Sequence, residues 1–359
     1  MRASYAPHAI GYAERVNRTA TSVLRAGSRI PAAVSMQAEM SNSQLHVVFG
    51  AGPVGLALAH ELVRPGRSVR LVTRSGRGQS IRGVERAAAD ASDENQAATI
   101  AQGAQVIYHA VGADYGHWAE LLPPVMAGLI HAASCTGARL VYADNLYAYG
   151  PVDRPLTENL PSAATGPNGR LRAELANTLL AAHRSGTLRA TIGRSSDFYG
   201  AGARLSTVGE RVFGRVARRK PAQILGDPDQ LHTYTFIGDF ARALAVLGER
   251  DEALGEVWHV PSAPTITTRQ FVELIAGQAG YRAGVQVTPS WIIRALGVVN
   301  PTMRAVAEQL YQSEQAFVVD HGKFARAFGA EPTPHAEAIQ RTLEWFRTST
   351  GPARAARRN

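Results

Sequence analysis

Three glycines near the beginning of the chain have the spacing of a phosphate-binding loop. Gly50, Gly52 and Gly55 follow the apolar run 45–49 and precede the apolar stretch 56–63. The first glycine permits a tight turn, the second lets the backbone approach a pyrophosphate, and the third lets a helix pack closely against a strand. The free N–H groups at the start of that helix would bind the phosphates. The loop therefore predicts a dinucleotide site and, with it, hydride-transfer chemistry.

The residues around the glycines strengthen this interpretation. A glycine turn without a ligand is the alternative, because the motif alone occurs in many loops. Here Gly66 and a second strand over 68–73 complete a strand–helix–strand unit, and Pro53 suits a first helical turn that has no N–H partner to lose. The predicted phosphate contacts are Gly50, Gly52, Pro53, Val54 and Gly55.

The end of the second strand favours NADP over NAD. An NAD site usually has Asp or Glu there to bind the ribose 2′-hydroxyl. This chain has Thr73, Arg74, Ser75 and Arg77 instead, which would suit a 2′-phosphate. Ordinary solvated arginines are the alternative, because only two of the 38 basic residues in the chain are lysines.

The composition excludes several classes of protein. The chain has 359 residues, of which 45% are hydrophobic, enough for a nucleotide domain and a smaller second domain. It contains no apolar run of about 18 residues that could span a membrane. Its single cysteine, Cys135, excludes internal disulfides and cysteine-based zinc sites. We therefore expect a soluble, cytoplasmic protein without a metal ion.

The net charge of +9 does not indicate nucleic-acid binding. About six of these nine charges lie in residues 1–40 and 349–359, and the rest of the chain has no basic groove studded with aromatic residues. Residues 1–40 are rich in Arg, Ala and Ser, which fits either a transit peptide for organellar import or a start codon placed too early, with Met36 or Met40 as the true start. We favour the early start, because the whole chain shares this composition.

The pattern after the second strand predicts an α/β fold. Short strands near 84–88, 105–109, 138–142 and 189–193 alternate with helical stretches, which is typical of a doubly wound parallel Rossmann sheet. Beyond residue 200 the expected helices are at about 205–219, 236–249, 267–279, 301–313 and 334–347, and the expected short strands are near 222–225 and 257–260.

These elements predict a division into domains. A Rossmann domain over 41–200 would follow the N-terminal extension 1–40. A smaller, mostly helical substrate domain would cover 201–348, with segments near 222–262 returning to the Rossmann domain, and a basic tail would cover 349–359.

Five motifs, in this order, resemble one enzyme family. They are Asp90-Ala-Ser-Asp93 after the third strand, Tyr108-His-Ala-Val-Gly112 at the fourth, Asp144-Asn-Leu-Tyr-Ala-Tyr-Gly150 after the fifth, Arg194-Ser-Ser-Asp-Phe-Tyr-Gly200 after the sixth, and Tyr234-Thr-Phe-Ile-Gly-Asp239. Together they resemble the extended short-chain dehydrogenase/reductases, and more narrowly the NAD-dependent epimerase/dehydratase family, over about residues 45–348. The resemblance implies a Rossmann domain with a small C-terminal substrate domain, and a homodimer formed through two long helices near 115–135 and 169–184.

The chain departs from this family at the residues that exchange a proton. Family members carry Ser or Thr after strand five and a Tyr-x-x-x-Lys pair on the next helix, whose Tyr protonates or deprotonates the substrate oxygen. Alignment on Gly150 and the helix start places Asn145, Asn168 and Arg172 at these three positions. The resemblance then implies that Arg172 binds the ribose near the nicotinamide and that Asn145 donates to a carbonyl oxygen. Asn168 cannot exchange a proton, so the usual general acid is missing.

Other residues are candidates for this proton exchange. Tyr149 closes a turn that usually lines the site in the family, Tyr147 and Tyr115 lie nearby, and His109 stands where strand four meets the cofactor. Each Tyr could equally be a packing residue, and the backbone of His109 could matter more than its ring. The predicted catalytic residues are Tyr149, Asn145, Arg172 and His109.

The resemblance implies further contacts with cofactor and substrate. Asp90, Ala110, Arg172 and Asp197 would join Thr73, Arg74 and Arg77 in binding the cofactor. For Asp197, a helix cap or a solvated carboxylate is the alternative. Family members that act on nucleotide sugars typically have Arg-Asp-Tyr where this chain has His232-Thr-Tyr234, which disfavours a diphosphate substrate. The aromatic residues favour a small, moderately apolar carbonyl or alcohol, although they could equally belong to the core. The predicted substrate contacts are Tyr115, Trp118, Tyr147, Tyr199 and His232.

The sequence therefore predicts an atypical NAD(P)-dependent oxidoreductase or epimerase that acts on a small organic substrate by hydride transfer. Two alternatives stay open. One is a non-catalytic NADP-binding regulator that has lost the Tyr, and the other is an isomerase or dehydratase that uses tightly bound cofactor transiently. No nucleic-acid or membrane partner is expected.

Overall fold

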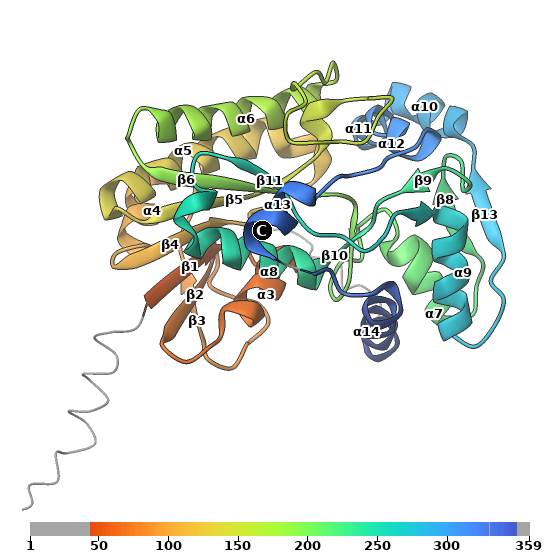
Figure 1. The fold of residues 1–359 in the computed structure, drawn as a ribbon, viewed down its shortest axis with the longest axis horizontal. Helices are drawn as coiled ribbons and strands as arrows, with labels where there is room; N and C mark the ends of the chain where they lie inside the picture. The colour runs from red at the N-terminus through yellow and green to blue at the C-terminus, as the bar shows by residue number, and fades with distance from the viewer. Residues whose placement is uncertain (1–43, 330, 350–359) are drawn as a thin grey trace, which may run out of the picture. The chain divides into compact units, whose positions relative to one another are not determined.

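The computed structural model describes residues 44–329 and 331–349. The predictions for the N-terminal extension 1–40 and for most of the basic tail lie outside these residues. Figure 1 follows the described chain from β1 to α14.

A seven-stranded parallel sheet forms the centre of the fold. Its order is β11-β6-β5-β4-β1-β2-β3, so the chain builds outward from β1 to β3 and then returns to the other side of β1 with β4. This reversal is a topological switch point, and in such sheets ligands bind beyond the carboxyl ends of the strands there, here β1 and β4. The strands are β1 (Gln44–Phe49), β2 (Arg67–Thr73), β3 (Val84–Ala88), β4 (Ala104–His109), β5 (Arg139–Asn145), β6 (Arg189–Ser195) and β11 (Val257–His259).

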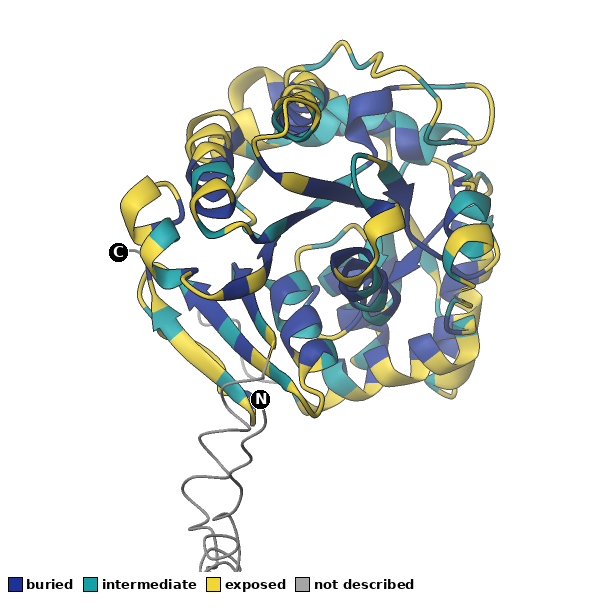
Figure 2. Ribbon diagram, turned by 60° about the vertical axis from the view of Figure 1, so that its left-hand side comes forward, coloured by how far each residue is buried: buried dark blue, intermediate teal, exposed yellow. Residues whose placement is uncertain are grey.

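Helices cover both faces of this sheet, which explains why its central strands are apolar on both sides. The residues Val47, Val48, Ile107 and Leu140 have no exposed surface. One face carries α4 (Glu94–Ile100), α5 (Trp118–Thr136) and α6 (Pro167–Arg184), and the other carries α3 (Pro53–Leu62) and α8 (Ile237–Glu249) (Figure 1). Figure 2 shows buried strands between helices whose exposed sides face outward. The predicted doubly wound α/β fold is confirmed.

The C-terminal region is mostly helical, as predicted, and has a hydrophobic core of its own. Phe213, Phe271 and Phe346 pack together there, and Val54 of α3 contacts both this core and that of the sheet. Its helices are α7 (Arg215–Ala217), α9 (Thr268–Gln278), α10 (Ser290–Val299), α11 (Pro301–Glu308), α12 (Tyr311–Glu314), α13 (Gly322–Phe328) and α14 (His335–Thr348). Short strands pair as β7 (Phe198–Tyr199) with β10 (Thr235–Phe236), β8 (Ala222–Leu225) with β13 (Val285–Thr288), and β9 (Leu231–His232) with β12 (Ile266–Thr267).

Two predicted helices differ from the structure. The stretch 205–219 forms turns, a π-helical segment η3 (Gly209–Gly214) and the short α7. The Arg204 carbonyl accepts the N–H of Glu210 at 2.8 Å, a hydrogen bond that spans more residues than one in a regular α-helix. The stretch 301–313 is divided into α11 and α12, and the preceding α10 was missed. Asn300 separates α10 from α11 and caps α11 by accepting the N–H of Met303 at 3.1 Å.

Candidate active site

The glycine loop leaves room for a ligand at one of its three glycines. Gly50 follows β1 with φ +106°, and a Cβ there would overlap the carbonyl of Ala110 at the end of β4. A Cβ at Gly55 would overlap the Gly50 carbonyl, so Gly55 lets α3 approach the loop closely. Nothing described lies within 4 Å of a Cβ built on Gly52, which precedes Pro53 at the start of α3. The backbone at Gly52 therefore has the open approach that a pyrophosphate requires.

The end of β2 presents cations and hydroxyl groups to solvent. Arg74 and Arg77 are exposed, and the Thr73 hydroxyl donates to the carbonyl of Arg77 at 3.5 Å. Asp90, after β3, accepts the N–H of Ser92 at 2.9 Å and its hydroxyl at 2.7 Å, and these bonds lower the pKa of Asp90. Asp90 is thus a fixed carboxylate near this edge of the sheet.

His109, the last residue of β4, holds a buried hydrogen-bond donor. Its Nδ1 accepts the N–H of Val111 at 3.3 Å, so Nε2 carries the ring proton. Within residues 44–329 and 331–349 this buried Nε2 has no hydrogen-bond partner. Burial, assisted by the Arg172 guanidinium, lowers the pKa of His109 to about 3. His109 is therefore neutral near pH 7 and can donate to a ligand, but it holds no second, exchangeable proton.

Arg172 points into the protein rather than to solvent. Its guanidinium lies 4.1 Å from the ring centroid of Trp118, and Nη1 donates to the Tyr142 hydroxyl at 2.7 Å. Its Nε is buried and has no partner in the described part of the chain. The rings of Tyr142 and His109 are 4.8 Å apart, so the two unpartnered donors, Arg172 Nε and His109 Nε2, both belong to side chains packed on Tyr142.

Asp144 fixes this arginine together with a second one. The Asp144 side chain has no exposed surface, its Oδ2 accepts from Arg194 Nε at 2.9 Å, and its Oδ1 lies 3.5 Å from Arg172 Nη1. Arg194 in turn covers the ring of Tyr149. Asp144 and Arg194 stand within two of the family motifs, but no role was predicted for either residue. A charged residue beside or within an apolar strand was the signal that could have revealed them, because buried charges are rare unless paired.

Tyr115, Trp118 and Tyr147 form a stacked aromatic cluster beside Arg172. The ring centroids of Tyr115 and Trp118 are 4.8 Å apart, and Tyr147 stacks against both rings. The hydroxyls of Tyr115 and Tyr147 are 2.7 Å apart, and burial raises the pKa of both. The structure therefore brings together three of the five predicted substrate contacts, and the two hydroxyls act there as neutral donors rather than as bases.

The two asparagines at the expected catalytic positions have different surroundings. Asn145 accepts the N–H of Tyr147 at 3.1 Å with Oδ1, which leaves its NH₂ group to donate. Asn168 is buried in the first turn of α6, where the carboxylate of Glu308 accepts the N–H groups of Asn168 at 3.3 Å and Gly169 at 3.1 Å. Glu308 was missed because it lies on α11, far along the chain. A carboxylate at a helix N-terminus is stabilised by the unpaired N–H groups there.

Two predicted site residues belong instead to the packing of the protein. Tyr149 is 1% exposed, and its hydroxyl lies 2.8 Å from Nε2 of His259. Because Nδ1 of His259 faces the Asp320 carbonyl at 3.0 Å and must carry the ring proton, the Tyr149 hydroxyl is the donor. Tyr199 has no exposed surface and stacks on Phe213 in the C-terminal core. The structure thus gives no support to Tyr149 as the general acid or to Tyr199 as a substrate contact.

Asp197 and His232, predicted to contact cofactor and substrate, are next to each other. Asp197 lies between β6 and β7, and its Oδ2 is 3.3 Å from Nε2 of His232 on β9. The imidazole packs between the rings of Tyr234 and Phe317, at centroid distances of 4.5 and 5.3 Å. Asp197 therefore has a specific buried partner, rather than capping a helix or standing in solvent.

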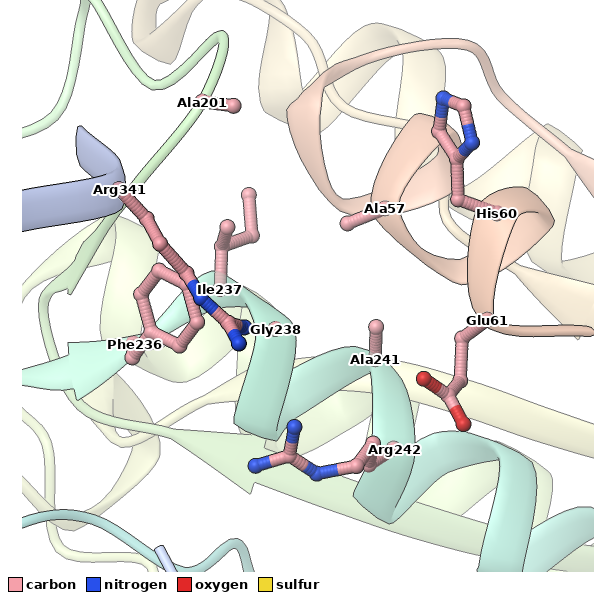
Figure 3. A pocket seen from close by; sticks show the side chains of 10 residues that line it. All are labelled: Ala57, His60, Glu61, Ala201, Phe236, Ile237, Gly238, Ala241, Arg242 and Arg341. Atoms are coloured by element: carbon pink, nitrogen blue, oxygen red, sulfur yellow. The ribbon is translucent and has the colours of Figure 1, made fainter. Parts of the chain in front are cut away.

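A pocket of about 340 Å³ between α3 and α8 is a separate feature. Figure 3 shows His60 and Glu61 on α3, and the guanidinium groups of Arg242 and Arg341 on the other side of the pocket. Both arginines are already paired, with Asp239 and Glu337 respectively. None of the residues predicted for the site lines this pocket, so the pocket is not part of that site.

Residues 44–329 and 331–349 contain no group of three or more His, Cys, Asp or Glu side chains that could hold a metal ion. Within the same residues, no helix has both the length and the apolar character needed to cross a bilayer.

The residues present fit a nicotinamide dinucleotide. The open backbone at Gly52 suits the pyrophosphate, and the buried donors Arg172 Nε and His109 Nε2 need acceptors that the described residues do not provide. The sheet order places both features along the carboxyl ends of neighbouring strands. This fold with this site defines an extended short-chain dehydrogenase/reductase.

Comparison with known proteins specifies the family. Residues 46–260 match the family described as "NAD dependent epimerase/dehydratase family", and the chain belongs to it. No curated protein matched the chain. Solved structures with the same fold include epimerase Mth375 from Methanothermobacter thermautotrophicus, which is 18% identical with a TM-score of 0.71 over 86% of this chain and 94% of that one.

Two other similar structures contain NAD. The UDP-glucuronic acid 4-epimerase from Bacillus cereus is 15% identical, with a TM-score of 0.69 over 85% of this chain and 99% of that one. The dTDP-glucose 4,6-dehydratase from Bacillus anthracis is 16% identical, with a TM-score of 0.71 over 86% of this chain and 98% of that one. At these identities the similarity concerns the fold.

Proposed function

We propose that this protein is an NAD(P)-dependent oxidoreductase or epimerase that acts by hydride transfer on a small carbonyl or alcohol compound. The observation that carries this proposal is the pair of buried, unpartnered donors on Arg172 and His109, at the same sheet edge as the open backbone of Gly52. A buried donor without a partner costs about 1–3 kcal/mol of stability. A ligand that accepts a hydrogen bond from each of these two donors would therefore stabilise the site. A bound nicotinamide dinucleotide would supply or accept the hydride there. Gly52 would bind its pyrophosphate and Arg172 its ribose.

The charges around the site favour an uncharged substrate over a nucleotide sugar. A diphosphate needs free cations, but Arg172 and Arg194 are both committed to Asp144. Among the described residues, His232 is the only basic side chain within 4 Å of the Asp197 carboxylate, so a phosphate beside His232 would also meet that carboxylate. A hydroxyl or carbonyl group could bond to Asp197, Asn145 or the tyrosine hydroxyls without a net charge.

We infer NADP as the preferred cofactor. The exposed Arg74 and Arg77 at the end of β2 support this choice, because two guanidinium groups suit a 2′-phosphate and no carboxylate takes the usual place at that strand end. The similar structures that contain NAD support the nicotinamide dinucleotide in general and make NAD the alternative outcome of the test.

The experiment is a fluorescence titration of the purified full chain, freed of any bound nucleotide, with NADPH and separately with NADH. Both should bind, NADPH more tightly. Arg172→Met should weaken binding about tenfold, the loss of one charge-assisted hydrogen bond. The matched control is Arg170→Met, because Arg170 lies two residues earlier on α6 and is exposed. Absence of binding by both cofactors would refute the proposal.

A second candidate function is a non-catalytic NADP-binding regulator. It is favoured by Asn168, which cannot exchange a proton, and by Glu308, which occupies the backbone donors next to it. Turnover separates the two functions: a regulator binds NADPH but does not consume it with any carbonyl compound. An epimerase that recycles its cofactor would instead retain nucleotide through purification and convert substrate without net NADPH consumption.

A further inference from the structure

The site needs a group that exchanges a proton near neutral pH, because hydride transfer between an alcohol and a carbonyl moves a proton to or from the substrate oxygen. Asn168 has no such proton. His109 is neutral, with a pKa of about 3, and the Tyr149 hydroxyl is bonded to His259. Burial raises the pKa of Tyr115, and it raises that of Tyr147 far above its usual value. These candidates therefore leave the proton exchange to another group.

The contacts of His232 favour a proton shared with Asp197. Its Nδ1 faces the carbonyl oxygen of Gln312 at 2.9 Å and must carry a hydrogen. Its Nε2 lies 3.3 Å from Asp197 Oδ2, which is an ion-pair distance, and makes no hydrogen bond to any described residue. Without a further proton, two acceptors would face each other in a buried place, which is unfavourable. One proton between Nε2 and Oδ2 removes this conflict.

The other groups shown within electrostatic reach of Asp197 are tyrosine hydroxyls. Asp197 lies within electrostatic reach of Tyr115, Tyr147, Tyr234 and Tyr311, and its charge raises the pKa of all four hydroxyls. These groups stay neutral near pH 7. In residues 44–329 and 331–349, His232 is the only cationic side chain within 4 Å of the Asp197 carboxylate. Because Tyr115 and Tyr147 belong to the aromatic cluster with Trp118, Asp197 also lies within electrostatic reach of that cluster.

We propose that Asp197 and His232 form the acid–base pair of this site and exchange their shared proton with the substrate oxygen, a role that rests on the proposed hydride-transfer function. Asp197, whose side chain is 14% exposed, is the catalytic residue that touches the substrate, and His232, at 4%, is a positioning residue that stores the proton. When a substrate carbonyl is reduced, the proton leaves the pair and forms the O–H bond of the alcohol; the hydride would come from a bound nicotinamide. When the substrate is oxidised, its O–H bond breaks and the proton returns to the pair.

The protonation state of His232 tests the pair without any turnover. The full chain with ¹⁵N-labelled histidine is measured by long-range ¹H–¹⁵N NMR near neutral pH, and His232→Gln identifies the His232 signals. Both ring nitrogens should be protonated in the unmodified protein, whereas Asp197→Asn should leave a neutral ring protonated at Nδ1. Tyr234→Phe is the matched control, because the Tyr234 hydroxyl bonds to Thr268 and not to the imidazole. A neutral His232 in the unmodified protein would overturn the proposal.

Turnover tests the catalytic role. NADPH oxidation is followed with benzaldehyde, cyclohexanone and glyceraldehyde as neutral probes. At saturating NADPH, Asp197→Asn should lower the rate with the best probe by about 100-fold, the usual contribution of a general acid. An unchanged rate in Asp197→Asn would overturn the role of the pair. Failure of the unmodified protein to bind NADPH or NADH would instead refute the proposed function, whatever the NMR result.

Discussion

Asp144→Asn tests whether one buried carboxylate holds the two arginines of the site. The Asp144 side chain has no exposed surface, and its oxygens face Arg194 Nε at 2.9 Å and Arg172 Nη1 at 3.5 Å. Asparagine keeps the shape but loses the charge, so two buried guanidinium groups would be left with one neutral amide, whose NH₂ cannot accept from either. Removing one partner of a buried ion pair costs about 3–5 kcal/mol. We expect the free energy of unfolding to fall by that amount.

The assay is urea unfolding followed by tryptophan fluorescence near neutral pH, in which the midpoint falls while the slope stays the same. Asp251→Asn is the matched control. Asp251 pairs with Arg139 at 2.6 Å, but its side chain is 77% exposed, so its loss should cost only about 0–1 kcal/mol. If Asp144→Asn cost no more than this control, burial would not be what makes the Asp144 pairs matter, and the reasoning would be refuted.

Three further predictions follow from the geometry. Gly52→Ala should fold normally but weaken NADPH binding, whereas Gly55→Ala should lower the melting temperature, because only the second adds a Cβ that overlaps backbone; thermal melting and the NADPH titration check both. Arg74→Ala should raise the Kd for NADPH about tenfold and leave the Kd for NADH unchanged in the same titration, consistent with one lost phosphate contact. Burial lowers the pKa of His259 to about 3 from a value near 6.5 in the unfolded chain, so the unfolded state binds the proton first and stability falls as the pH drops below about 6.5. By pH 5 this pKa shift should lower the free energy of unfolding by about 2 kcal/mol. Urea unfolding at pH 7 and pH 5 should therefore show a smaller loss of stability for His259→Gln than for the unmodified protein.

The local pattern was sufficient for the Rossmann half of the fold. The glycine spacing and the apolar strands predict β1, α3 and β2, because each element there buries residues close to it in sequence. Asp93 also caps α4 by accepting two N–H groups at 3.0 Å, as its place before a helix suggests. The two-residue strands β9 and β12 could not be predicted, since their pairing depends on residues far apart in the chain.

Helix α10 was missed for a different reason. Its apolar residues Trp291, Val298 and Val299 are largely exposed while Ile293 is buried, so the apolar positions do not mark the side that faces a core. In the site, the positions of Arg172 and the Tyr115 and Tyr147 pair followed from motifs, but the partners that decide their chemistry did not. Glu308 and His259 reach the site region from α11 and β11, and only the tertiary structure brings them there.

Two departures of this chain from its family, the missing general acid on α6 and the missing cation for a diphosphate, are connected through charge. If Asp197 and His232 exchange the proton, then the acid–base group has moved from α6, where Asn168 now stands, to the end of β6. The same two residues disfavour a diphosphate at the site, because the Asp197 carboxylate repels phosphate and offsets the charge of the protonated imidazole beside it. The loss of the general acid on α6 and the loss of nucleotide-sugar binding would then be one change and not two. A variant that removes the Asp197 charge should therefore both slow proton exchange and increase the affinity of the site for anionic substrates. Two independent changes would not produce this combined outcome.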